Sequence, residues 1–232
     1  MEEQANTGDW SANAMELPPH AQFFGSLVSV SVELDVLREY ILHMDQSIEE
    51  AEAACQTSVQ AVPPSLQSIA EDKSDLLAEP FPRLLHTGVI ISTVILLEQE
   101  LTFFARFLQK VEGLGLSLGD LRGSLVERFK KYCLHVARLP FPVSERNWQD
   151  LRGVIEIRNC LVHNEGFLDG FNKACAVRAF MDDHGTPLVE DGRLCVGADT
   201  SLKVLDVVKL FIESIHNEAL QKYPDDKGGS KE

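Results

Sequence analysis

The feature that most constrains this chain is a set of apolar stripes that repeat at helical spacing. Between residues 34 and 51, apolar side chains recur at steps of three and four residues, with acidic side chains between them. A second series with the same spacing runs from Leu205 to Ile215. This spacing places apolar side chains on one face of an α-helix, so we expect helices that bury one face against each other.

Prolines, glycines and residues able to cap helices divide the chain into further elements. We predict five long helices, at residues 24–58, Pro82 to Glu112, a Ser117–Asp120 capping box to Arg138, Ser144 to His163, and Asp199 or Thr200 to Tyr223. Residues 61–80 are predicted to be a connecting loop with room for a short helix, whereas residues 167–185 show no clear pattern.

Residues 187–196 predict a β-hairpin, because the Asp191-Gly192 pair suits a two-residue turn between short apolar runs. The predicted fold is therefore all-α, a bundle of about five helices with a small β-hairpin before the last helix. Residues 1–22 are predicted to be a flexible N-terminal arm, residues 23–223 the helical domain, and residues 224–232 a disordered tail.

The charge of the chain is strongly acidic but unevenly distributed. The 232 residues hold 36 Asp and Glu against 21 Lys and Arg, a net charge of −15. Residues 1–80 alone carry 15 acids and 2 bases, whereas residues 120–160 carry five acids and eight bases. The average argues against a protein that coats duplex DNA, and we expect any anion site within residues 120–160.

The five cysteines are odd in number and widely spaced, which argues against a disulfide framework and favours a cytoplasmic location. The N-terminus has neither a basic flank nor an apolar core typical of a secretory signal. The most apolar run, Gly88 to Leu97, is too short to span a bilayer, so no membrane partner is expected.

Arg158 is the residue that departs most from the helical pattern. On the predicted fourth helix its neighbours three and four residues away are all apolar, so its guanidinium emerges from a core-facing stripe. A charge in that position is costly unless it is paired, and a guanidinium matches carboxylate or phosphate. The structural alternative is a buried ion pair with Glu98 or Glu100.

Two further polar residues accompany Arg158. Asn159 follows it directly, and His163 closes the same helix five residues later. On an ideal helix positions five apart differ by about 140°, so Arg158 and His163 converge on one ligand only if the last turn loosens or a second copy of the helix shares the ligand. Alternatively, a histidine at the C-terminus of a helix is a cap whose positive charge interacts favourably with the helix dipole.

The run IRNCLVHNEG, which contains these three residues, resembles the Arg-x4-His signature of the HEPN superfamily, the higher eukaryotes and prokaryotes nucleotide-binding domains. The resemblance covers roughly residues 81–222, and residues 24–58 supply a first bundle helix. It implies an all-α bundle that forms a homodimer, in which two copies of the motif face one cleft. In active members it implies metal-independent cleavage of RNA.

The resemblance assigns catalytic roles to Arg158, Asn159 and His163. To these we add Glu98 as a candidate supporting residue. His163 would act as base or acid, Arg158 would hold the phosphate, and Asn159 would orient either of them. The implied function is a toxin or phage-defence endoribonuclease that acts on tRNA or mRNA and has an antitoxin protein as partner. The alternative is a non-catalytic HEPN-like module that binds a nucleotide or a protein.

Other chemical signatures are missing from the sequence. It contains no phosphate-binding loop, no zinc-protease motif and no nucleophile elbow. Cys160 and His163 have the spacing of two zinc ligands but lack a second pair, so neither a metal nor a cofactor is expected.

Overall fold

The structure, a computed structural model, describes residues 17–141, 143–186, 189–190 and 192–225. Over these ranges the chain is an all-α helical bundle, which confirms the predicted fold class. Its four long helices are α1 (Pro19–Ala61), α3 (Pro80–Glu112), α5 (Glu145–His163) and α7 (Ala198–Lys222).

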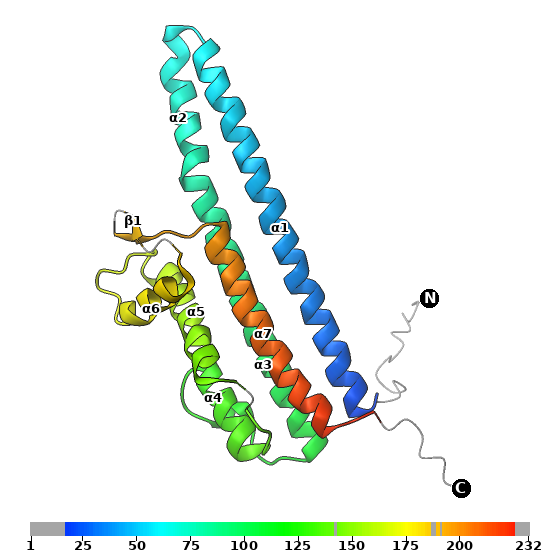
Figure 1. The fold of residues 1–232 in the computed structure, drawn as a ribbon. Coiled ribbons are helices and arrows are strands. Elements are labelled where there is room, and N and C mark those ends of the chain that lie inside the picture. The colour runs from blue at the N-terminus through cyan, green and yellow to red at the C-terminus, as the bar shows by residue number, and fades with distance from the viewer. Residues whose placement is uncertain (1–16, 142, 187–188, 191, 226–232) are drawn as a thin grey trace, which may run out of the picture.

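The four long helices pack around a continuous apolar core. Helix α1 packs against α3 and α7, and α5 packs against the same two helices from the other side (Figure 1). Along α1 the core is filled at steps of seven by Leu34, Ile41, Ile48 and Cys55. The helical periodicity of the sequence therefore corresponds to the buried faces.

Helix α1 is much longer than the bundle needs. Its second half pairs with α2 (Gln67–Ala78), and together they extend well beyond α5 and α7 (Figure 1). A 3₁₀ turn at Pro64–Leu66 connects the two helices, and α3 follows α2 after Glu79. Residues 61–80 were predicted to be a loop that could contain a short helix, and α2 is that helix.

The third predicted helix is not continuous. The Ser117–Asp120 capping box is present, but it closes only a 3₁₀ turn at Leu118–Asp120. Gly123 then has a φ of +126°, and a second capping box, Ser124 with Glu127, begins α4 (Leu125–Lys131). A π-helical turn, Tyr132–Val136, follows α4. The glycine breaks the helix that periodicity alone predicts as one.

Between α5 and α7 lies a small subdomain. Helix α6 (Ala174–His184) packs on α5, and strands β1 (Val189–Glu190) and β2 (Arg193–Leu194) pair in antiparallel fashion as the predicted hairpin requires. Gly192 has a φ of +80°, as expected for such a turn, whereas Asp191 lies outside the described residues.

The ends of the bundle differ slightly from the expected boundaries. Helix α1 begins at Pro19, so residues 19–22 belong to the helix and not to the predicted arm. Residues 1–16 of that arm and residues 226–232 of the predicted tail lie outside the described residues.

One helical stretch, residues 67–112, is long and apolar enough by composition to cross a membrane. Half of its most apolar window is buried within the bundle. Core packing of α3 therefore accounts for much of this apolar character.

Candidate functional site

Helix α5 carries the residues singled out by the sequence. It begins with Ser144, whose Oγ accepts a hydrogen bond from the Asn147 backbone N–H at 3.2 Å. At its far end the backbone N–H groups of Asn164 and Gly166 both donate to the Cys160 carbonyl at 3.0 Å. Glu165 and Gly166 have φ values of +51° and +83°, which end the helix just after the motif.

Gly153 brings α5 unusually close to α6. A Cβ atom at this position would lie 2.7 Å from the Phe180 Cβ atom, which is closer than packed carbon atoms approach. The glycine therefore fixes the distance between the motif helix and its neighbour.

Arg158 lies half-buried on α5, and its only side-chain partner among the described residues is Asn159. Its Nη1 donates to the Asn159 Oδ1 atom at 3.2 Å, while its Nε is buried and has no hydrogen-bond partner. None of the ion pairs formed between described residues includes Arg158. The guanidinium therefore retains free donors for an anion.

The structural alternative for Arg158, an ion pair with Glu98 or Glu100, is wrong. Glu100 is buried and bound elsewhere, because its Oε1 lies 2.8 Å from His216 Nε2 and also accepts from Ser26 Oγ at 2.8 Å. Glu98 lines a separate surface pocket with Arg106 and Arg128, so the structure does not bring the expected supporting carboxylate to Arg158.

His163 and Asn159 complete the motif but do not meet in one site. Asn159 donates from Nδ2 to the Glu156 carboxylate at 3.3 Å, which holds the Arg158–Asn159–Glu156 series along the helix surface. His163 is exposed in the last turn and forms no hydrogen bond or ion pair with another described residue. Because α5 is regular through His163, the 140° separation from Arg158 remains.

Cys160 is a structural thiol in this arrangement. It is buried, it donates to the Phe167 carbonyl at 3.2 Å, and burial raises its pKa to about 11. A protonated thiol is a poor metal ligand. Within the described ranges no cluster of three or more His, Cys, Asp or Glu side chains could hold a metal ion.

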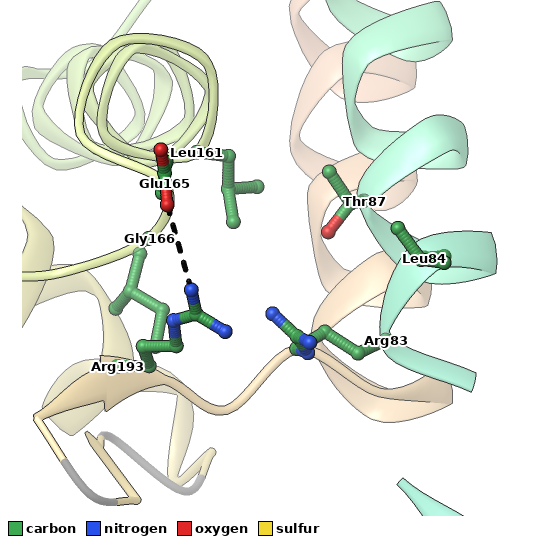
Figure 2. Close-up of a pocket in the computed structure, with 8 residues that line it drawn as sticks. Arg83, Leu84, Thr87, Leu161, Glu165, Gly166 and Arg193 are labelled. Atoms are coloured by element: carbon green, nitrogen blue, oxygen red, sulfur yellow. Dashed lines mark ion pairs between the residues drawn. The ribbon is translucent and has the colours of Figure 1, made fainter. Parts of the chain in front are cut away.

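A groove that the sequence did not indicate adjoins the end of α5. Two hollows, of about 240 and 560 Å³, share Arg83, Arg193 and Leu194 in their walls. Figure 2 shows the smaller one, where the guanidinium groups of Arg83, from the start of α3, and Arg193, from β2, point toward one another. Leu161 and Gly166 form the wall on the α5 side.

No sequence signal could have joined these two arginines, because 110 residues separate them and neither belongs to a motif. The positive stretch at 120–160 contributes three basic residues and Glu127 to one surface pocket. Lys130, Lys131 and Arg152 line a pocket of about 390 Å³, and Lys130 lies 4.5 Å from the centre of the Trp148 ring.

No protein-family model, no curated protein and no solved structure matches this chain. Its function must therefore be argued from the geometry of its own residues.

Proposed function

We propose that this protein is a metal-independent endoribonuclease of the HEPN type, acting as a toxin or phage-defence effector on tRNA or mRNA. It works as a homodimer, an antitoxin protein restrains it, and it resides in the cytoplasm. Arg158, Asn159 and His163 form its catalytic group.

The state of Arg158 is the observation that carries this proposal. A guanidinium set among apolar side chains is normally neutralised by a carboxylate. Here the carboxylate that could have done so, Glu100, is bound to His216, and the Arg158 Nε has no partner. A phosphate group, two of whose oxygens accept parallel N–H donors, supplies the missing acceptor.

The chemistry follows from the residue types. His163 takes the proton from a ribose 2′-hydroxyl, whose oxygen attacks the adjacent phosphorus. Arg158 neutralises the charge that develops on the phosphorane oxygens, with Asn159 fixing the guanidinium through the Nη1 hydrogen bond. The bond to the 5′-oxygen breaks, and this oxygen receives a proton from the second copy's His163, which acts as the acid. The products are a 2′,3′-cyclic phosphate and a 5′-hydroxyl.

Two copies of the chain are required for this site. Arg158 and His163 of one α5 diverge, so a histidine from one copy must approach the arginine of the other. The exposed His163, which is free of partners in the described part of its own chain, suits that role.

The test is RNA cleavage in EDTA by the purified protein, with tRNA and total RNA as substrates. His163→Ala is expected to lower the rate by at least about 100-fold, the usual contribution of a general base. The matched control is His43→Ala, which removes an exposed histidine from α1. An all-deoxy strand, which lacks the 2′-hydroxyl, must stay intact, and its cleavage at a comparable rate would refute the mechanism.

A second candidate function, a non-catalytic module that binds a nucleotide, is favoured by one observation. Within one chain Arg83 and Arg193 converge on a groove, but His163 is not among the residues that line this groove. Binding of a nucleotide by the parent without cleavage of any RNA, and unchanged binding by His163→Ala, would support the module.

A further inference from the structure

We propose that Arg83 and Arg193 form a phosphate-binding subsite, which holds a backbone phosphate of an RNA strand next to the α5 motif. The inference rests on the proposed function for the identity of the strand. The groove itself is argued from its own geometry.

The two arginines are held in place but incompletely bonded. Each side chain is about one-third exposed, at 30% for Arg83 and 31% for Arg193. The Nε atoms of both are buried and without a hydrogen-bond partner. The Arg193 guanidinium carbon lies over the Phe167 ring, 4.4 Å from its centre, and the guanidinium points toward Arg83 across the groove.

The acids beside these arginines neutralise them only weakly. Glu79 Oε1 lies 3.1 Å from Arg83 Nε without hydrogen-bond geometry, and Glu165 Oε2 lies 3.6 Å from Arg193 Nη2. Both carboxylates are largely exposed, at 63% and 82%. Pairs of this kind contribute little in water, so an entering anion can displace both carboxylates without leaving a buried charge.

A phosphate is the ligand that fits these donors. Two facing guanidinium groups offer planar sets of N–H donors to the oxygens of a phosphate, which are arranged tetrahedrally around phosphorus. Leu161, in the wall of the groove, lies one helical turn after Arg158 on the same side of α5. A strand bound at Arg83 and Arg193 thus extends toward Arg158, where the proposed cleavage occurs.

The experiment measures binding separately from cleavage. The probe is a fluorescent single-stranded oligonucleotide in which every 2′-hydroxyl is methylated, so that it cannot be cleaved by this route. Arg83→Ala and Arg193→Ala are each expected to weaken binding about tenfold, as the loss of a charge-assisted hydrogen bond does. Each is also expected to reduce the salt dependence of log K by about 0.7.

Two further variants separate a phosphate site from a general effect of charge or folding. Arg128→Ala removes the same charge and another buried, unpartnered Nε, but from α4 outside the groove, and its affinity should remain within about twofold of the parent. Glu165→Gln removes the competing carboxylate and should tighten binding, an effect that loss of structure cannot produce. Inorganic pyrophosphate should compete with the probe for binding to the parent protein. It should not compete for binding to the variant that carries both Arg83→Ala and Arg193→Ala.

The outcomes also distinguish the subsite from the proposed function. Parental affinity in the Arg83→Ala, Arg193→Ala double variant, or an equal loss in Arg128→Ala, would overturn the subsite even where the parent cleaves RNA. Binding that depends on both arginines, in a protein that cleaves no RNA, establishes the subsite and refutes the ribonuclease.

Discussion

One buried histidine in this bundle, His86, links protonation to folding. His86 on α3 is buried, with Nδ1 3.2 Å from Ser201 Oγ and Nε2 3.4 Å from Asp45 Oδ1. Desolvation lowers the pKa of His86 below its ordinary value of 6.5, and this effect exceeds the opposing attraction of Asp45. The folded protein therefore holds His86 neutral where the unfolded chain would protonate it.

The sign of the resulting pH dependence follows directly. Below pH 6.5 and above the lowered pKa, the unfolded state binds more protons, so the free energy of unfolding falls as the pH falls. We expect a slope of at most about 1.4 kcal/mol per pH unit from this residue. Urea denaturation of the parent and of His86→Gln between pH 7.5 and 5.5 measures it. The variant should show a shallower slope, whereas the exposed-residue variant His43→Ala should keep that of the parent.

At the scale of residues, the sequence could reveal an anomaly but not its partner. Arg158 stands out because its helical neighbours are apolar, and its half-burial on α5 agrees with that reading. Which carboxylate it meets depends on the rotation of α3 and α7, which no local pattern encodes. Glu100 turns toward His216 for that reason, and Arg83 and Arg193 meet only through the fold of the hairpin.

At the scale of elements, a buried polar network connects three helices. Glu100 on α3 binds Ser26 on α1 and His216 on α7. His216 Nδ1 also lies 3.0 Å from the Phe23 carbonyl, so both ring nitrogens face acceptors. Because a carbonyl oxygen only accepts, Nδ1 donates to the Phe23 carbonyl, and Nε2 faces the Glu100 carboxylate.

Removing one member of this network should be costly. His216→Ala leaves the Glu100 carboxylate buried with only Ser26 as partner, and we expect the free energy of unfolding to fall by about 3–5 kcal/mol. Chemical denaturation measures the loss, and the surface change His43→Ala should cost no more than about 0.5 kcal/mol. A loss below about 1 kcal/mol for His216→Ala would show that the network does not hold the helices together.

The elements themselves were predictable where periodicity and caps agreed. Ser144 and the Asn164–Gly166 stop define α5 in the sequence and in the structure alike. The structure between Ser117 and Arg138 was not predictable, because this interval holds two capping boxes. Only the second of them begins an α-helix, α4, whereas the first closes a 3₁₀ turn. The apolar spacing in the sequence continues across Gly123, but the backbone leaves the helical conformation at this glycine.

At the scale of the whole molecule, α1 presents an apolar face to solvent. Five side chains at steps of four residues are between 45% and 61% exposed, namely Phe24, Val28, Val32, Val36 and Tyr40. Val32 and Val36 border a hollow of about 400 Å³ that Ile95 and Leu96 of α3 complete. The periodicity could not predict this face, since the stripe beginning at Leu34 already accounts for the core.

A row of apolar side chains at steps of four is the ridge that one helix packs into the groove of another. Two copies related by a two-fold axis would cover each other's ridge, which makes the α1 and α3 face the expected interface of the proposed homodimer. Of these two helices only α3 carries Arg83 and packs on α5, whereas α1 lies on the other side of the bundle from α5.

Val36→Glu tests whether this face holds two copies together. A charge placed in the middle of an apolar interface loses its hydration, so we expect the variant to be monomeric while its circular dichroism spectrum stays that of the parent. Light scattering after gel filtration measures the mass, with Leu210→Glu, which changes an exposed residue of α7, as the matched control. A Val36→Glu protein that keeps the mass of a dimer would place the interface on another face, and a monomer that cleaves at the parental rate would refute a site shared between copies.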